Sequence, residues 1–156
     1  EKPLDVHLMI EKPERKLDTI IDAGADIITI HQESTTRLYS CIEKIKSRGV
    51  KAGVVLSPAT NEDTLKYVLD KIDMILLMTI NPGEAGPGFH EELLTKIKNV
   101  RELIGDRDID LEVDGGIDNT NIAKCKEAGV NVFVSGGYVF KGDIAEKIKT
   151  LREALK

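Results

Sequence analysis

Short apolar runs alternate with longer amphipathic stretches along the whole chain. Several of the runs are rich in Ile and Val and nearly continuous, which is typical of strands buried on both faces of a parallel sheet. The runs lie at residues 5–10, 26–31, 51–56, 74–80, 110–114 and 131–136. The pattern therefore predicts six buried strands.

Helical periodicity fills the segments between these runs. In one of them Leu38, Cys41, Ile42 and Ile45 recur at the spacing of a single helix face. Helices are predicted at residues 13–23, 34–47, 61–69, 91–103, 119–128 and 143–155. Repetition of strand and helix in this order indicates an α/β fold with a parallel sheet.

Glycine marks the junctions where predicted helices give way to strands. Gly24, Gly49 and Gly129 each occupy such a position, and glycine enters the left-handed C-terminal cap of a helix without strain. No linker or change of composition divides the chain, so residues 1–156 are predicted to form a single domain.

The loops that follow the strands separate two possible architectures. A doubly wound sheet normally carries G-x-G-x-x-G in its first strand–helix turn, and no strand here is followed by that pattern. A barrel tends to bind phosphate in its last two such loops, which read DGGI (114–117) and SGGY (135–138) here. Paired glycines let backbone N–H groups approach an anion closely. The predicted phosphate donors are Gly115, Gly116, Gly136 and Gly137.

Composition and charge narrow the classes of function. The chain has 22 Lys and Arg against 27 Asp and Glu, a net charge of -5, and no dense basic run, so a nucleic-acid partner is not expected. No apolar run has the length of a membrane span and no signal-peptide pattern opens the chain, so no membrane partner is expected either. Cys41 and Cys125 share no metal-type spacing. They are interpreted as free thiols of a reducing compartment, which predicts a cytoplasmic location.

Six stretches of the chain match a known family in order and spacing: LDVHLMI, AGADIITIHQE, VKAGVVLSPAT, MILLMTINPG, EVDGGI and VSGGYVF. They resemble the pentulose- and hexulose-phosphate 3-epimerases, above all the ribulose-phosphate 3-epimerase family. The resemblance covers essentially the whole chain and implies a TIM-type (β/α)8 barrel. It also implies that this chain begins at the third strand of the family, so we expect an incomplete barrel that contains units three to eight.

The resemblance implies epimerisation at C3 of a ketose phosphate, from D-ribulose 5-phosphate to D-xylulose 5-phosphate in the pentose phosphate pathway. In the family two aspartates work on opposite faces of the inverted carbon. Asp114 matches one of them, and no residue here matches the other, so we expect this fragment to be inactive by itself. Two alternatives stay open. One is an epimerase of a hexulose phosphate such as allulose 6-phosphate, and the other is a non-catalytic relative that binds a sugar phosphate.

His7 and Asp114 also match metal ligands of the family. From the residues alone, a lone histidine on a strand is more often a satisfied core residue, and the match favours the ligand reading. The implied cofactor is a divalent ion, with zinc favoured and iron, manganese or cobalt as alternatives. Catalytic zinc sites usually keep three protein ligands, so two would bind zinc poorly.

Other residues match the substrate site of the family. Met9 and Met78 match methionines that line it, although core packing would also explain them. Gly83 and Gly86 match positions of the loop that closes over the substrate, which departs from the family at Glu84. Gly137 stands where a Ser or Thr is usual, which removes one hydroxyl contact to phosphate.

Two further expectations concern neighbours of the site. His31 and Glu33 also match the family, and a hydrogen bond in support of the ligands is predicted for them. The first and last strands would leave open sheet edges, which invite pairing with another chain. A homo-oligomer is therefore predicted.

Overall fold

The computed structural model describes residues 2–84 and 88–156. One parallel sheet of six strands runs through them in the order β1-β2-β3-β4-β5-β6, so each strand pairs with the next strand along the chain. The strands are β1 (Asp5–Leu8), β2 (Ile27–His31), β3 (Lys51–Leu56), β4 (Met74–Met78), β5 (Asp110–Asp114) and β6 (Val132–Val134). All six predicted strands are confirmed, and four of them are shorter than predicted.

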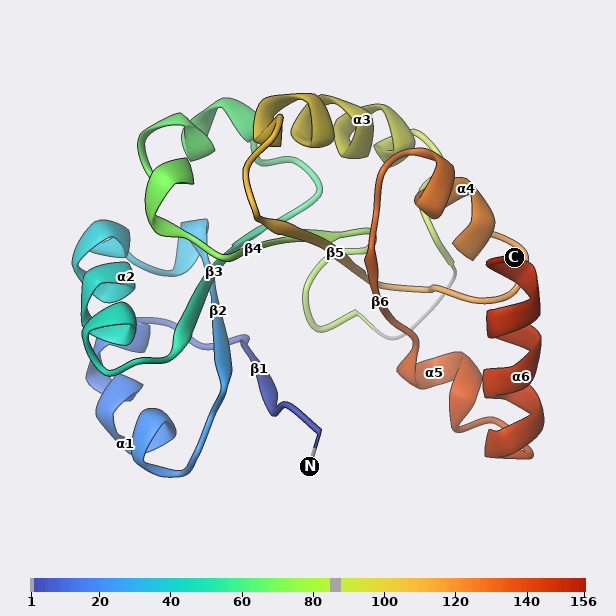
Figure 1. Cartoon of the computed structure of the whole chain (residues 1–156), viewed down its shortest axis with the longest axis horizontal. Coiled ribbons are helices and arrows are strands. Elements are labelled where there is room, and N and C mark those ends of the chain that lie inside the picture. The colour runs from blue at the N-terminus through green and yellow to red at the C-terminus, as the bar shows by residue number, and fades with distance from the viewer. Residues whose placement is uncertain (1, 85–87) are drawn as a thin grey trace.

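The helices lie along the outer, convex side of the curved sheet, so the molecule is a half-barrel (Figure 1). The α-helices are α1 (Leu17–Asp22), α2 (Leu38–Ser47), α3 (Leu93–Ile104), α4 (Ile122–Glu127), α5 (Gly136–Val139) and α6 (Ile144–Ala154). Short 3-10 helices are η1 (Pro13–Arg15), η2 (Gln32–Ser34), η3 (Glu62–Tyr67) and η4 (Leu69–Lys71). The predicted junction glycines Gly24, Gly49 and Gly129 all have positive φ, as a helix C-terminal cap requires.

One helix prediction was wrong, and one short helix was not predicted. The α-helix predicted at residues 61–69 is the pair of 3-10 helices η3 and η4. Leu65 and Val68 are buried there, and their spacing of three suits a helix with three residues per turn. The short helix α5 was not predicted, because Gly136 and Gly137 at its start indicate a loop from sequence.

In the central strands β3 and β4, side chains on both faces of the sheet are buried, as their continuous apolar runs predicted. Most buried side chains belong to one cluster between the sheet and its helices, including Ile28, Ile30 and Val54. A second, smaller cluster joins Val55, Leu76 and Met78. Since successive side chains of a strand alternate between faces, this second cluster lies on the concave side.

Two buried polar groups share the concave face with this cluster. Thr29 pairs in register with Gly53, two residues before Val55, and Glu112 pairs with Leu76. The Thr29 hydroxyl and the Glu112 Oε2 atom are buried without a hydrogen-bond partner in the described part of the chain. Burial raises the pKa of Glu112 to about 8, and the nearby carboxylate of Asp5 contributes to the rise.

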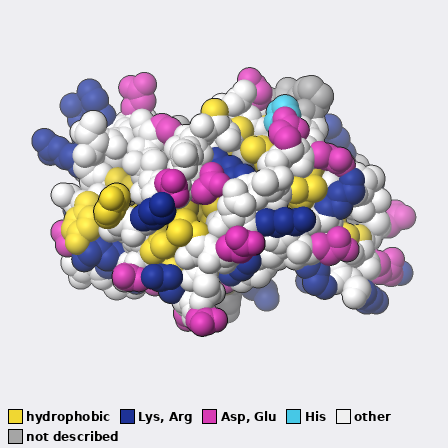
Figure 2. Space-filling model, turned by 90° about the horizontal axis from the view of Figure 1, so that it is seen from above, with side chains coloured by type: hydrophobic (Ala, Val, Ile, Leu, Met, Phe, Trp, Pro, Cys, Tyr) yellow, Lys and Arg dark blue, Asp and Glu magenta, His cyan; other side chains and the backbone are white. Residues whose placement is uncertain are grey.

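The outer surface carries both charge signs. On the face seen from above, basic and acidic side chains are interspersed around smaller apolar areas (Figure 2). Among the described residues, no helix combines the length and the apolarity that crossing a membrane requires. Cys41 and Cys125 are buried free thiols, as predicted.

Candidate active site

Three predicted side chains, from β1, β2 and the distant strand β5, meet at the carboxyl end of the sheet. The Nδ1 atom of His7, on β1, lies 3.3 Å from the Oδ2 atom of Asp114, at the end of β5. The Nε2 atom of His7 lies 2.8 Å from the Nε2 atom of His31, and the two ring centroids are 4.9 Å apart. The curvature of the sheet brings β1 to β5, although three strands separate them in the sheet order.

The two glycines after Asp114 are required by close packing. Gly115 and Gly116 have φ values of +127° and +65°. A Cβ atom on Gly115 would lie 2.6 Å from Ile80 Cγ1, and one on Gly116 would lie 2.7 Å from the Phe89 nitrogen. Any side chain would therefore displace the neighbouring loop, so these glycines fix the backbone that carries Asp114.

The second glycine pair lies in open space. A Cβ atom on Gly136 or Gly137 would meet no atom within 4 Å among the described residues. The Ser135 hydroxyl donates to the Ile117 carbonyl at 2.6 Å and so ties this turn to the loop after β5. The two glycine turns are therefore neighbours, as predicted from their positions after successive strands, and room for a ligand remains beside the second one.

A cavity of about 770 Å³ lies between the two turns. It is lined by five residues predicted for the site: Asp114, Gly115, Gly116, Gly136 and Gly137. Lys141 also lines it and is the one basic residue among the described lining residues. The sequence interpretation missed this lysine, although its place four residues after Gly137, close to a predicted phosphate turn, is a usable signal.

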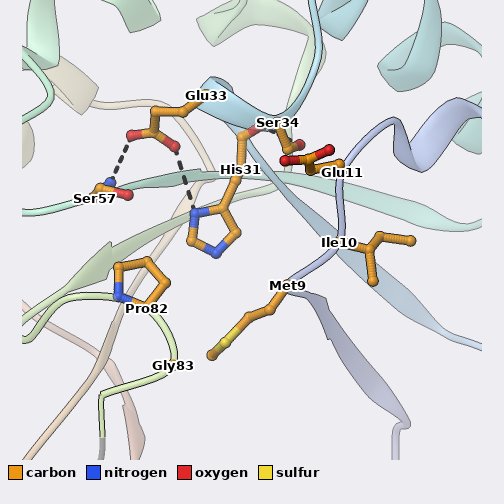
Figure 3. Close-up of a pocket in the computed structure, with 9 residues that line it drawn as sticks. All are labelled: Met9, Ile10, Glu11, His31, Glu33, Ser34, Ser57, Pro82 and Gly83. Atoms are coloured by element: carbon orange, nitrogen blue, oxygen red, sulfur yellow. Dashed lines mark hydrogen bonds and ion pairs between the residues drawn. The ribbon is translucent and has the colours of Figure 1, made fainter.

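A second cavity, of about 490 Å³, is lined by Met9, His31, Glu33 and Gly83, among others (Figure 3). Glu33 Oε1 accepts hydrogen bonds from the Ser57 N–H, at 2.9 Å, and from the Thr60 hydroxyl. Glu33 Oε2 lies 3.5 Å from His31 Nδ1. The predicted supporting contacts of His31 and Glu33 are therefore present.

Met78 is 3% exposed, packs against Val55 and Leu76, and lines neither of the two cavities described above, so its predicted place in the substrate site stays a prediction. Gly86 lies outside the described residues, and its predicted role stays a prediction.

The four titratable groups form one row, Asp114–His7–His31–Glu33. Its three contacts would need three hydrogens, and two neutral imidazoles supply only two. Burial lowers the pKa of His31, and the neighbouring His7 ring lowers it further, which disfavours an extra proton there. The two carboxylates therefore compete for the same two ring hydrogens.

The described residues supply only part of a metal site. His7 and Asp114, the two predicted ligands, are adjacent. In residues 2–84 and 88–156, however, no group of three His, Cys, Asp or Glu side chains is placed to hold a metal ion. His31 does not add a third ligand, because its Nε2 atom contacts the His7 ring. The donor set falls short of the three ligands that catalytic zinc usually keeps.

Comparison with known proteins identifies relatives of this chain. Residues 1–140 match the model of the ribulose-phosphate 3 epimerase family. The chloroplastic ribulose-5-phosphate-3-epimerase of Arabidopsis thaliana is 44% identical over 155 residues, which cover 96% of this chain and 55% of that protein. The ribulose-phosphate 3-epimerase of Bacillus subtilis is 43% identical and that of Escherichia coli K12 is 42% identical, with 71% and 69% of their lengths covered.

Solved structures with lower identity share the fold. A 3-keto-L-gulonate-6-phosphate decarboxylase from Vibrio cholerae superposes with a TM-score of 0.78 at 18% identity, over 97% of this chain and 71% of that one. A ligand complex of KGPDC from Streptococcus mutans gives 0.79 at 17% identity, over 99% and 73%. The family model and the curated relatives together show that this chain belongs to the ribulose-phosphate 3-epimerase family.

Proposed function

We propose that Asp114 is one of the two acid–base groups of a ketose-phosphate 3-epimerase that interconverts D-ribulose 5-phosphate and D-xylulose 5-phosphate. One observation carries the proposal. The Asp114 carboxylate, in contact with His7, lines the same cavity as the glycine turns at 115–116 and 136–137. A proton-transfer group and a set of backbone N–H donors therefore face one ligand-sized space.

The chemistry fits this arrangement. The C3 hydrogen of the sugar is acidic because it lies next to the C2 ketone, and Asp114 would remove or return it on one face. Backbone N–H groups of the two glycine turns would hold the phosphate at the other end of the sugar, with Lys141 as the neighbouring cation. A bound phosphate fixes the distance from Asp114 to the reacting carbon. Part of the binding energy of the phosphate would therefore be used to orient the sugar toward Asp114.

The comparisons support the substrate class. The chain spans 55% of the Arabidopsis relative and about 70% of the bacterial ones. We propose for this chain the substrate class after which those whole proteins are named. The Vibrio cholerae enzyme on the same fold is named for a phosphorylated sugar acid, 3-keto-L-gulonate 6-phosphate. A hexulose 6-phosphate is the alternative substrate, because Glu84 lines the cavity where the family usually has an aromatic residue.

We also propose that a divalent metal ion is the cofactor of this site. His7 and Asp114 are the residues of this chain that would hold it, and zinc is favoured over iron, manganese and cobalt. When bound, such an ion would supply electrostatic stabilisation of the enediolate oxygens.

The proposed epimerisation also needs a second acid that acts on the opposite face of the sugar carbon. Besides Asp114, the described carboxylates that line the cavity are Glu84 and Asp118. Asp118 Oδ1 accepts hydrogen bonds from the N–H and the hydroxyl of Thr120, at 2.7 and 2.6 Å. Glu84 Oε1 accepts a longer contact of 3.3 Å from Asn81. We therefore propose that the 156-residue chain binds a sugar phosphate and does not epimerise it alone.

The test follows proton exchange and epimerisation separately. The chain is incubated with ribulose 5-phosphate and zinc in heavy water, and the sugar is followed by NMR. Slow deuterium uptake at C3 that depends on Asp114, without xylulose 5-phosphate, is the expected result. Uptake that is equal in the Asp114→Asn variant would contradict the role of Asp114. Rapid conversion by the chain alone would show that a second carboxylate, with Glu84 the first candidate, reaches the other face.

A further inference from the structure

Two side chains hold the backbone of the turn at residues 114–117 from outside the cavity. The hydroxyl of Thr79, directly after β4, donates to the Gly115 carbonyl at 2.5 Å. The side-chain amide of Asn121 donates from Nδ2 to the Gly116 carbonyl at 2.8 Å. Neither Thr79 nor Asn121 is among the described residues that line the cavity between the glycine turns. Two successive carbonyl groups of this turn are therefore fixed from behind by two different side chains.

The side chain of Asn121 serves the turn rather than its own helix. Asn121 stands at the N-cap position of α4, where an asparagine normally accepts a hydrogen bond from the first helical N–H groups. Its side chain forms no such bond with the described part of the chain. Instead, Oδ1 accepts the Asp118 N–H at 3.0 Å while Nδ2 donates to the Gly116 carbonyl. The residue is 7% exposed, so these two contacts replace the hydration that its amide loses.

Thr79 is also committed to the turn. Its backbone N–H donates to the Asp114 carbonyl at 2.8 Å and extends the pairing of β4 with β5 by one residue. The side chain is fully buried. A hydroxyl has one hydrogen, and the Gly115 carbonyl lies closer to it than the Asp114 carbonyl, at 2.5 against 3.1 Å. Thr79 therefore anchors the two residues at the start of the turn.

Fixed carbonyls also fix the N–H groups of the same peptides. In a trans peptide the C=O and the following N–H point in opposite directions, and no cis peptide occurs among the described residues. The N–H groups of Gly116 and Ile117 therefore point away from Thr79 and Asn121. Neither N–H donates to an acceptor within residues 2–84 and 88–156, and both residues line the cavity. Two donors are thus available to an anion there.

The glycines themselves do not select this orientation. Gly115 and Gly116 lack the side chains that restrict φ and ψ, so the peptides on either side of Gly116 can rotate and exchange the directions of C=O and N–H. The hydrogen bonds from Thr79 and Asn121 stabilise one orientation before a ligand binds. Because the donors are already ordered, less conformational entropy is lost on binding.

We propose that Thr79 and Asn121 are positioning residues of the turn at 114–117. By holding the carbonyls of Gly115 and Gly116, they keep the N–H groups of Gly116 and Ile117 directed at a bound phosphate. The inference rests on the proposed function, because it takes this turn as part of the phosphate site. It adds two residues that act on phosphate binding without touching the ligand.

The experiment measures the affinity of the 156-residue chain for inorganic phosphate. Thr79→Val removes the hydroxyl donor with little change in shape, and Asn121→Leu removes both polar atoms of the amide. Each should weaken phosphate binding by about fivefold or more, the effect expected when one hydrogen bond of the site is lost. Thr79→Ser keeps the hydroxyl and should stay within about twofold of wild type.

Backbone 1H–15N spectra recorded without phosphate provide a second readout. Thr79→Val releases the Gly115 carbonyl, so the Gly116 amide signal should broaden or split as its peptide samples two orientations. Asn121→Leu releases the Gly116 carbonyl, so the same change should appear at the Ile117 amide. Thr79→Ser should keep the wild-type signals. Asn121→Leu decides by itself if Thr79→Val does not fold.

Two matched variants control for a general loss of stability. Thr29→Val changes another fully buried threonine, whose hydroxyl has no partner in the described part of the chain. Asn131→Leu removes an asparagine that bridges the Leu111 N–H and the Asp110 carboxylate, at the opposite end of β5 from the turn. Both controls should keep the phosphate affinity and the turn amide signals of wild type.

The outcomes separate the alternatives. Wild-type affinity and turn amide signals in folded Thr79→Val and Asn121→Leu variants would overturn the proposal. Equal weakening in the Thr29→Val and Asn131→Leu controls would overturn it too, because the effect would then be one of general stability. Absence of phosphate binding by the wild-type chain would overturn both this inference and the phosphate site of the proposed function. The expected variant pattern without Asp114-dependent deuterium uptake would support this inference and refute the epimerase proposal alone.

Discussion

His7 and Asp114 are 107 residues apart in sequence, and their side chains meet at 3.3 Å. They belong to β1 and β5, which are not neighbours in the sheet. The contact therefore depends on the curvature of the whole sheet, since a flat sheet would hold these strands about 19 Å apart at the usual spacing of neighbouring strands. Any change that opens the sheet should separate this pair before it disturbs the individual strand–helix units.

Asp114→Asn should abolish proton exchange and leave the fold intact. Loss of one positioned acid–base group typically lowers a rate by about two to four powers of ten, and the asparagine amide is nearly isosteric. Deuterium uptake into ribulose 5-phosphate is the readout, with circular dichroism as the control for folding. A variant that keeps more than about a tenth of the uptake would assign the proton transfer to another group.

Lys141→Gln should weaken binding of sulfate or a sugar phosphate by roughly threefold to tenfold. The side chain is exposed, so a surface-type charge contribution is expected rather than that of a buried pair. Calorimetric titration measures the affinity. Lys149→Gln, on the exposed side of α6, is the matched control, because its Nζ atom pairs with Glu153 at 3.9 Å and does not line the cavity. Equal losses in both variants would mean that only net charge matters.

The two glycine turns should respond differently to alanine. Gly115→Ala should lower the free energy of unfolding by roughly 2–4 kcal/mol, because the new Cβ meets Ile80 and the backbone has positive φ. Gly137→Ala meets open space and should change it by less than about 1 kcal/mol. Denaturant titration compares the two. A large loss in Gly137→Ala would show that the second turn is as tightly packed as the first.

Glu112 should make the fold less stable as the pH rises. Its pKa is about 8 in the folded chain and about 4.5 when unfolded, so the folded state holds the proton more tightly. Stability is then fully present below pH 4.5 and is lost progressively up to about pH 8, by at most on the order of 5 kcal/mol. Glu112→Gln should flatten this dependence in denaturant titrations at several pH values. An equal slope in both chains would place the titrating group elsewhere.

Zinc should bind this chain weakly and through His7. Two ligands make an incomplete site, so we expect a dissociation constant in the micromolar range or weaker at neutral pH. His7→Ala should weaken binding further by at least about tenfold, as measured by competition with a chromogenic chelator. His90→Ala removes an exposed histidine that pairs with Glu92 at 3.4 Å and serves as the control. Tight binding that survives His7→Ala would locate the metal at different residues.

Local signals in the sequence were enough for the order of elements and for part of the site. Continuous Ile- and Val-rich runs specify strands buried on both faces, and the glycines at 24, 49 and 129 end helices because the backbone there needs positive φ. The glycines after Asp114 were identified because paired glycines directly follow a predicted strand, whereas the role of Asp114 came from the family resemblance. The 3-10 helices at 62–71 and the helix at 136–139 were missed, because short helices depend on packing more than on periodicity.

Only the tertiary structure decided how distant residues combine. It distinguished Met9, which lines a cavity, from Met78, which is buried in the core, although both are methionines at the ends of strands. It joined Asp114, His7, His31 and Glu33 into one row. It also placed Lys96 against the Ser57 carbonyl and Lys141 in the cavity that Asp114 lines. Sequence patterns report the periodicity of neighbouring residues, whereas these contacts arise from the curvature of a six-stranded sheet, which every strand and helix sets together.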